Sequence, residues 1–239
     1  MKNFWGIDVG GKRGTISTRI FKDSGRWHFE IIELKHTEHF RQIWIDSPGP
    51  IAIDAPLTYA PSAANGFRPI DEHWRETLSH SQRNWVISTH SLLAVPIKGL
   101  WLIQGLPETP VIIECHPRVG MKRLFQNTSL SEDIEIYKSN QYQREENRSR
   151  SQAALERRDM ARQRLWDRLS SRFHASSQIE DPNDDQIDSF FCALLCMEAN
   201  GEESPLRIRR SGIDFAEMSD KESKLENLRD FKQMILKAA

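Results

Sequence analysis

Short, nearly continuous apolar runs that end on an acidic residue recur along the first half of the chain. Three runs show this pattern: residues 3–9, 51–54 and 111–114. Apolar character without polar alternation is typical of strands that are covered on both faces. Such strands end together along one edge of an open α/β sheet, where ligands bind. The pattern therefore predicts that Asp8, Asp54 and Glu114 lie near that edge.

Two more strands are predicted at roughly 13–21 and 26–35, and with the first strand they would form a meander. Glycines between residues 10 and 14 supply the first turn, and the stretch 22–25 supplies the second. A helix over 37–46 follows and ends at a Ser-Pro-Gly-Pro stretch.

The rest of the chain has mainly helical patterns. Residues 56–110 contain several prolines and three of the seven tryptophans but no strand period, which indicates an inserted helical and loop segment. Further helices are predicted at 118–126, at 143–173 in an Arg-rich stretch, at 185–199 and at 222–238. The residues between 201 and 224 carry no regular pattern.

Three antiparallel strands followed by two parallel ones is the ribonuclease H-like order of elements. We therefore expect an α/β domain over residues 1–200, with a mixed five-stranded sheet flanked by helices and with 56–110 as its insertion. Residues 201–239 would form a C-terminal extension that carries the terminal helix. A chain of 239 residues is long enough to bury the core that such a domain needs.

Composition narrows the possible partners. The formal net charge of −1 gives no overall attraction to nucleic acid, so any nucleic-acid contact must come from a local basic surface. No leader pattern and no apolar run of spanning length occurs, so no membrane association is expected. Three cysteines without metal-ligand spacing suggest buried thiols in a reducing, cytoplasmic environment.

Five short blocks resemble, in order, the predicted nucleases of domain-of-unknown-function family 429. The blocks are Gly6-Ile-Asp8-Val-Gly10-Gly-Lys12, Ile53-Asp54-Ala-Pro56-Leu57, Arg68-Pro-Ile-Asp71-Glu-His-Trp-Arg75, Ile113-Glu114-Cys-His-Pro117-Arg118 and Asp185-Gln-Ile-Asp188-Ser. They cover roughly residues 5 to 200. Ser189 stands where the family usually has Ala after the last acidic pair, and the match around residues 212–215 is loose. The resemblance implies a ribonuclease H-like fold and a nuclease activity, without a known substrate.

The acidic residues suggest a metal site. In two-metal hydrolases, carboxylates hold two divalent ions roughly 3.5–4 Å apart, and the ions contact the attacking and leaving oxygens of a phosphodiester. Hard oxygen ligands suit Mg²⁺ or Mn²⁺. The predicted catalytic acids, placed as in Holliday-junction resolvases, are Asp8, Asp54, Glu114, Asp185 and Asp188. Asp8, Asp54, Glu114 and Asp188 are the expected metal ligands, with Glu114 as a ligand or an outer base.

Each acid also has a structural explanation. Asp8 and Asp54 could be turn residues, and Glu114 could pair with Arg118. Asp184 or Asp185 could cap the last helix, because Asp is a preferred N-cap residue. The joint occurrence of these acids at strand ends and at a helix start favours a metal site over the separate structural explanations.

Three cations are candidates for substrate binding. Lys12 and Arg13 lie on the glycine turn beside Asp8, where they could contact phosphate, although the same residues also suit a plain hairpin turn. Arg75 follows Asp71 by one helical turn and could form either a structural pair or a substrate clamp. Glu and Asp residues interrupt the Arg-rich helix, which favours a solvated face with ion pairs over a nucleic-acid surface.

The sequence thus predicts a Mg²⁺- or Mn²⁺-dependent nuclease that acts on DNA or RNA. One alternative is an actin-like ATP-dependent phosphotransferase, because Asp8-Val9-Gly10 also resembles the phosphate loop of that superfamily. The second such loop is missing, since Asp54 is followed by Ala and Pro. The other alternative is a non-catalytic nucleic-acid-binding or adaptor domain that has kept the acids.

Overall fold

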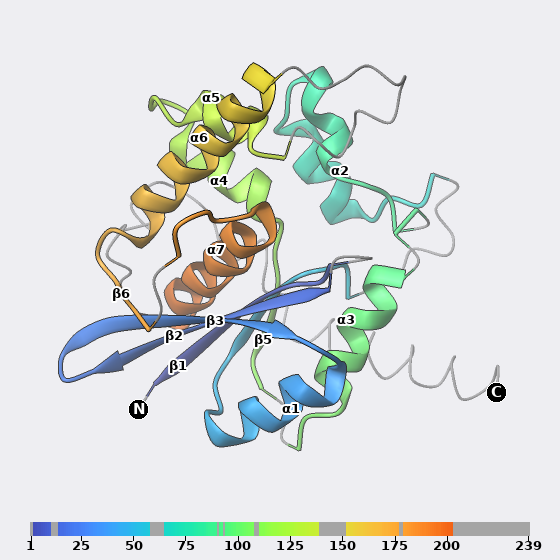
Figure 1. Ribbon diagram of the computed structural model, residues 1–239. Coiled ribbons are helices and arrows are strands. Elements are labelled where there is room, and N and C mark those ends of the chain that lie inside the picture. The colour runs from blue at the N-terminus through green and yellow to red at the C-terminus, as the bar shows by residue number, and fades with distance from the viewer. Residues whose placement is uncertain are drawn as a thin grey trace.

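The computed structural model describes most of the chain as a sheet with helices on both faces (Figure 1). The described residues are 2–10, 14–57, 65–89, 91–92, 94–107, 110–138, 152–176 and 179–202. Several sequence predictions lie outside them: the glycine-turn cations Lys12 and Arg13, the start of the Arg-rich helix before residue 152, and everything beyond residue 202. No helix in the described ranges combines the length and apolar character needed to cross a bilayer.

The sheet is mixed and has six strands in the order β5-β4-β1-β2-β3-β6. The strands are β1 (Asn3–Asp8), β2 (Thr15–Asp23), β3 (Arg26–Leu34), β4 (Ile51–Asp54), β5 (Ile112–Glu114) and β6 (His174–Ala175). β1, β2 and β3 form the antiparallel meander, and β4 and β5 extend the sheet in parallel beside β1. This part of the topology agrees with the sequence prediction.

The predicted count of five strands is wrong, because β6 adds a sixth. It pairs in parallel with β3 through only two residues, His174 and Ala175. Both are exposed, so no hydrophobic alternation marks them as a strand. Pairing with the edge of β3 alone defines this strand, and edge pairing is not visible in the local sequence.

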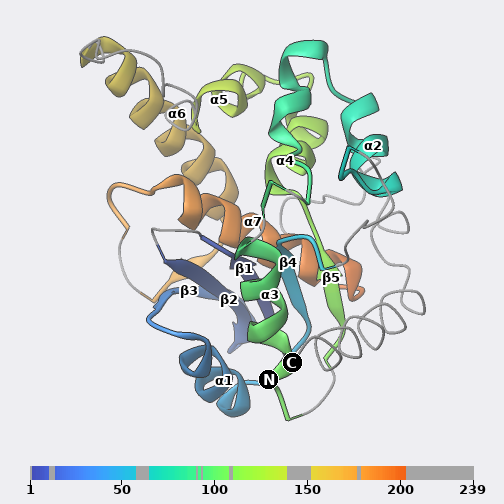
Figure 2. The ribbon, with the colours of Figure 1, turned by 90° about the vertical axis from the view of Figure 1, so that its right-hand side faces the viewer.

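Helices cover the sheet in two layers (Figures 1 and 2). The helices are α1 (Thr37–Asp46), α2 (Pro69–Glu76), the 3₁₀ helix η1 (His80–Trp85), α3 (Ala94–Gln104), α4 (Pro117–Phe125), α5 (Ser131–Ile136), α6 (Gln152–Ser170) and α7 (Asp184–Ala199). α1 and α3 pack on one face, while α7, with α4 and α6 beside it, packs on the other. Alternate β1 residues divide between the layers: Phe4 joins the α7 side, and Trp5 and Ile7 join the α1 and α3 side.

The predicted insertion at 56–110 is helical but includes a core helix. α3 lies within that range, yet its Leu100, Leu102 and Ile103 are buried against β1 and β4 side chains. α3 therefore belongs to the crossover that connects the parallel strands β4 and β5. In the described part of the insertion, α2 and η1 lie beyond the strand ends, near α4 (Figure 2).

α7 lies in close contact with β1 because residue 6 is glycine. A Cβ atom at Gly6 would come within 2.1 Å of the Ser189 carbonyl oxygen and 2.2 Å of the Ala193 nitrogen. The helix begins at Asn183, whose side chain accepts a hydrogen bond from Gln186 N, so the predicted Asp184 or Asp185 cap is wrong. The cap and the glycine contact together place the first turns of α7 beside the carboxyl end of β1.

Candidate carboxylate site

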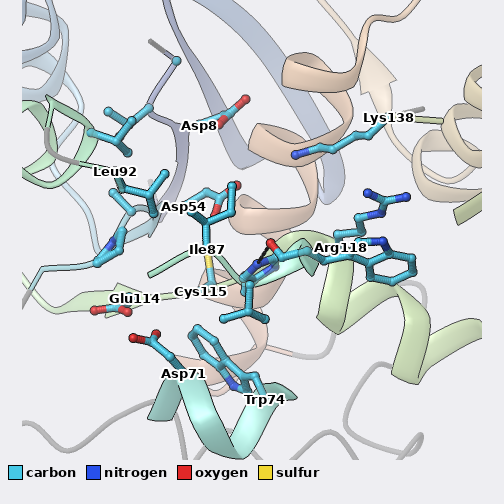
Figure 3. Close-up of a pocket in the computed structure, with 18 of the residues that line it drawn as sticks. Asp8, Asp54, Asp71, Trp74, Ile87, Leu92, Glu114, Cys115, Arg118 and Lys138 are labelled. Carbon is cyan, nitrogen blue, oxygen red and sulfur yellow. Dashed lines mark hydrogen bonds between the residues drawn. The ribbon is translucent and has the colours of Figure 1, made fainter. Parts of the chain in front are cut away.

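A pocket of about 390 Å³ opens where β1, β4 and β5 end (Figure 3). The carboxylates in its lining are Asp8, Asp54, Asp71, Glu114 and Asp185. Its apolar lining residues come from the insertion and the start of α3: Trp74, Trp85, Val86, Ile87, Leu92 and Val95. Four of the predicted catalytic acids, Asp8, Asp54, Glu114 and Asp185, therefore line one pocket.

Asp8 and Asp54 are direct neighbours in the sheet. They form a register pair of the parallel strands β1 and β4, so their side chains leave the same face of the sheet. That face is the one covered by α7, because Phe4 and Ala52 precede them on the same side and belong to the α7 core. Adjacent strands lie about 4.8 Å apart, a spacing at which two carboxylates repel strongly in a poorly solvated site.

The environment of these two acids favours their protonated forms. Burial raises the pKa of Asp8 well above its usual value, and Asp54, Asp188 and Asp185 raise it further, while Lys138 opposes the shift. Burial also raises the pKa of Asp54, to about 7, again opposed by Lys138 and reinforced by nearby carboxylates. Within the described residues, neither carboxylate has a hydrogen-bond or ion-pair partner. An added cation would therefore be well accommodated here.

Asp188 is placed differently from Asp8 and Asp54. Its side chain is fully buried, and its Oδ1 accepts a hydrogen bond of 2.8 Å from the Tyr137 hydroxyl. Its Oδ2 forms an ion pair with the ammonium of Lys138. Asp188 thus has a hydrogen bond on one carboxylate oxygen and an ion pair on the other, and it lies close enough to Asp8 and Asp54 to raise the pKa of both.

Lys138 was not among the residues that sequence reasoning selected. It follows the short helix α5 and extends its side chain toward Asp8 and Asp54 (Figure 3). Burial alone would lower its pKa, but Asp188, Tyr137, Asp54 and Asp8 together raise it well above the usual lysine value. A single lysine outside any motif gives no sequence signal, so only the tertiary structure shows that it belongs to this site.

Glu114 also lines the pocket, but its side chain leaves the other face of the sheet. It pairs in register with Ile53 rather than with Asp54, so its side chain leaves β5 on the face covered by α3. The residue that continues the Asp8 and Asp54 row is Cys115, whose sulfur lies 3.0 Å from that of Cys192 on α7. A register offset of one residue therefore separates Glu114 from the other predicted metal ligands.

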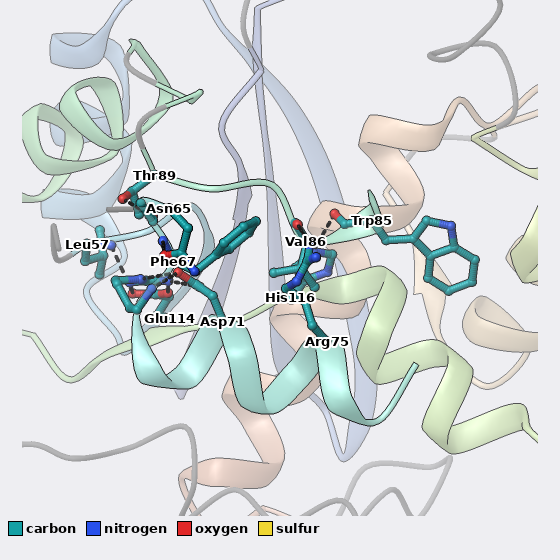
Figure 4. A network of polar contacts seen from close by, with 12 residues as sticks. Leu57, Asn65, Phe67, Asp71, Arg75, Trp85, Val86, Thr89, Glu114 and His116 are labelled. Carbon is teal, nitrogen blue, oxygen red and sulfur yellow. Dashed lines mark hydrogen bonds and ion pairs between the residues drawn. The ribbon is translucent and has the colours of Figure 1, made fainter. Parts of the chain in front are cut away.

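Arg68 neutralises Glu114 (Figure 4). Its guanidinium contacts both Glu114 oxygens, at 2.9 and 2.5 Å, and also bonds both oxygens of Asp71. Glu114 Oε2 accepts a further hydrogen bond of 2.9 Å from Leu57 N. All three charged side chains are nearly inaccessible to solvent. This network joins the insertion to β5, which makes Glu114 a structural anchor next to the site.

Arg75 and Arg118, which the sequence suggested as partners of Asp71 and Glu114, form other contacts. Arg75 stacks on Phe67, 4.2 Å from the ring centroid, and donates to the carbonyls of Arg83 and Val86 (Figure 4). It is not part of the pocket lining, and Asp71 pairs with Arg68 instead. Arg118 does line the pocket, but it stacks 3.8 Å over Trp85 and donates to the carbonyl of Ile134.

The described part of the Arg-rich helix, α6, uses several arginines for ion pairs. Arg162 contacts Asp184 at 2.6 Å, and Arg164 contacts Asp133 at 2.5 Å. Both acids are buried, so these contacts fix α6 against α7 and α5. Both pairs run to buried acids on other helices, whereas the sequence suggested a solvated face paired with acids of the helix itself.

The donors present fit one divalent ion better than two. Asp8 and Asp54 offer carboxylate oxygens of the kind that Mg²⁺ and Mn²⁺ prefer, and Asp185 also lines the pocket. Glu114 and Asp188, the other expected ligands, are already held by Arg68 and Lys138. The described residues contain no preformed cluster of three or more His, Cys, Asp or Glu ligands. Because Mg²⁺ keeps several waters, two or three carboxylates suffice to hold one ion.

Comparison of the chain with protein-family models, curated proteins and solved structures gives no match. The resemblance to domain-of-unknown-function family 429 therefore stays a prediction from the sequence blocks.

Proposed function

We propose that this protein is a divalent-metal-dependent nuclease built on a ribonuclease H-like fold. The observation that carries the proposal is the Asp8 and Asp54 register pair, which presents two carboxylates side by side in a pocket at the ends of parallel strands. The antiparallel β1-β2-β3 meander, with β4 and β5 added in parallel, supports the fold assignment.

The raised pKa values of Asp8 and Asp54 support a cation-binding role. Two adjacent carboxylates destabilise the empty pocket, and this destabilisation becomes affinity for a cation that binds the folded state. Asp8 and Asp54 would hold a Mg²⁺ or Mn²⁺ ion, and Asp185 would contact it from α7. When bound, such an ion polarises a phosphodiester and lowers the pKa of a water molecule.

The apolar residues in the pocket lining favour a substrate that has an apolar group in addition to phosphate. Trp74, Trp85 and Ile87 line the same pocket as the acids and provide an apolar surface for a nucleobase or sugar. A volume of about 390 Å³ lies at the lower end of the range for small-ligand sites, so one nucleotide fits the pocket better than a duplex. Lys12 and Arg13 keep their predicted role as phosphate contacts beside Asp8.

The test is cleavage of single-stranded, duplex and branched DNA and of RNA in the presence of Mn²⁺. Asp8→Asn and Asp54→Asn should each reduce cleavage by about a hundredfold or more, because each removes a negative charge at the ion while keeping side-chain size. Nucleic-acid binding should persist in both variants. Asp46→Asn changes an exposed carboxylate at the end of α1 and serves as the matched control.

Three outcomes would contradict the proposal. Cleavage that persists in the Asp8 variant would locate the activity at another site or in a contaminant. Nucleic-acid binding without cleavage of any substrate would favour the non-catalytic binding domain, whereas ATP turnover would favour the phosphotransferase.

A further inference from the structure

Lys138 is a buried cation inside a group of carboxylates. Its side chain is 14% exposed, and the side chain of its partner Asp188 is completely buried. The Tyr137 hydroxyl holds the other oxygen of Asp188, which fixes the acid in place. An ammonium in this position is a permanent part of the site rather than a surface charge.

The same ammonium acts on the two acids proposed to hold metal. It favours the charged forms of both Asp8 and Asp54, and in each case it is the largest influence opposing burial. Figure 3 shows its side chain extending toward these two carboxylates. Lys138 thus lies within electrostatic reach of Asp8, Asp54 and Asp188.

Charge balance limits how many further cations the site can take. The carboxylates of Asp8, Asp54, Asp185 and Asp188 carry four negative charges when ionised. The Lys138 ammonium and one divalent ion balance three of these four charges, and a second divalent ion would leave a net positive charge. A second divalent ion would need Asp188, which Lys138 occupies, and would lie beside a fixed positive charge.

We propose that Lys138 occupies the second cation position of this site, so that the folded protein takes one divalent ion rather than two. The inference rests on the proposed metal-dependent function and specifies its metal requirement. The ammonium neutralises Asp188 and stabilises this buried carboxylate of α7 before any ion binds. It also repels the bound ion, which weakens the affinity of the Asp8 and Asp54 pair for metal.

The test is calorimetric titration of the purified protein with Mn²⁺, together with melting temperatures in EDTA and in saturating Mn²⁺. Wild type should bind one ion. Lys138→Met should bind two, with the first bound about tenfold or more tightly, because the repelling charge is lost and Asp188 becomes available. Its melting temperature should rise more on adding Mn²⁺ than that of wild type. Lys138→Arg keeps the charge and should bind one ion as wild type does.

Lys138→Met leaves Asp188 buried without its cation, which destabilises the folded variant in EDTA. The double variant Lys138→Met, Asp188→Asn removes both charges and keeps an acceptor for Tyr137. It should fold and bind one ion about tenfold more tightly than wild type, because the repulsion is gone and the ligand for a second ion is gone too.

Either of two results would overturn the inference: a wild type that does not bind one ion, or single and double variants with unchanged ion number and affinity. A wild type that binds two ions and cleaves nucleic acid would overturn the inference while leaving the proposed function intact. A wild type that neither binds Mn²⁺ nor cleaves any substrate would overturn both.

Discussion

Asp54 lies at the end of β4, where burial and the neighbouring carboxylates raise its pKa from 3.8 to about 7 against the opposing effect of Lys138. In the unfolded chain this group loses its proton near pH 4, whereas the folded protein keeps it until about pH 7. Between these values the folded state binds more protons than the unfolded state. The Asp54 contribution to the free energy of unfolding therefore falls as pH rises through this window and stays low above it.

The magnitude follows from the shift. Each pKa unit corresponds to about 1.4 kcal/mol, so a shift of about three units gives an upper limit of roughly 4 kcal/mol. Asp54 is partly open to the pocket, and solvent screening reduces the effect to an expected value on the order of 2 kcal/mol. Asp54→Asn removes this penalty. The metal-free variant should melt roughly 4–8 °C above wild type at about pH 8 and close to it at about pH 4.

The assay is thermal unfolding followed by circular dichroism in EDTA across this pH range. Saturating Mn²⁺ should reverse the order at about pH 8, because the ion stabilises wild type and the variant has lost a ligand. Asp46→Asn, at an exposed position, should show neither effect. If wild type and Asp54→Asn keep the same difference in melting temperature from acid to alkaline pH, the Asp54 carboxylate is not destabilised by folding and the argument for a cation site fails.

Two other substitutions test how the site is held. Gly6→Ala should lower the free energy of unfolding by about 1–3 kcal/mol or more and reduce Mn²⁺ binding, because its Cβ would displace α7 at Ser189. Unchanged stability in denaturant unfolding would contradict the close contact between β1 and α7. Arg68→Met should cost about 3–5 kcal/mol, because it leaves buried acids without their cation. Arg157→Ala breaks an exposed pair with Glu132 and should cost less than about 1 kcal/mol in the same assay; equal losses would show that the Arg68 network is not a buried anchor.

Much of the fold followed from local patterns. The boundaries of α1 and β4 match those predicted, because a Pro-Gly stop and an isolated apolar run define them within a few residues. The proximity of Asp8 and Asp54 was also predictable, because two buried parallel strands that each end on an acid bring those ends together at one edge of the sheet. The start of α7 was found to within one residue, although the cap is Asn183 rather than one of the following acids.

Register and long-range contacts decided the rest. Glu114 ends its strand as Asp8 and Asp54 do, but the pairing of β5 with β4 is offset by one residue, which moves its side chain to the opposite face, where Arg68 holds it. Lys138 reaches Asp188 across 50 positions of the chain. Hydrophobic periodicity reports which face of an element is buried, and it contains no information about strand register or about which charges meet. The sequence alone therefore determined the strands, their polarity and two central acids, whereas only tertiary packing decided which carboxylates stay open to a cation and which are already neutralised.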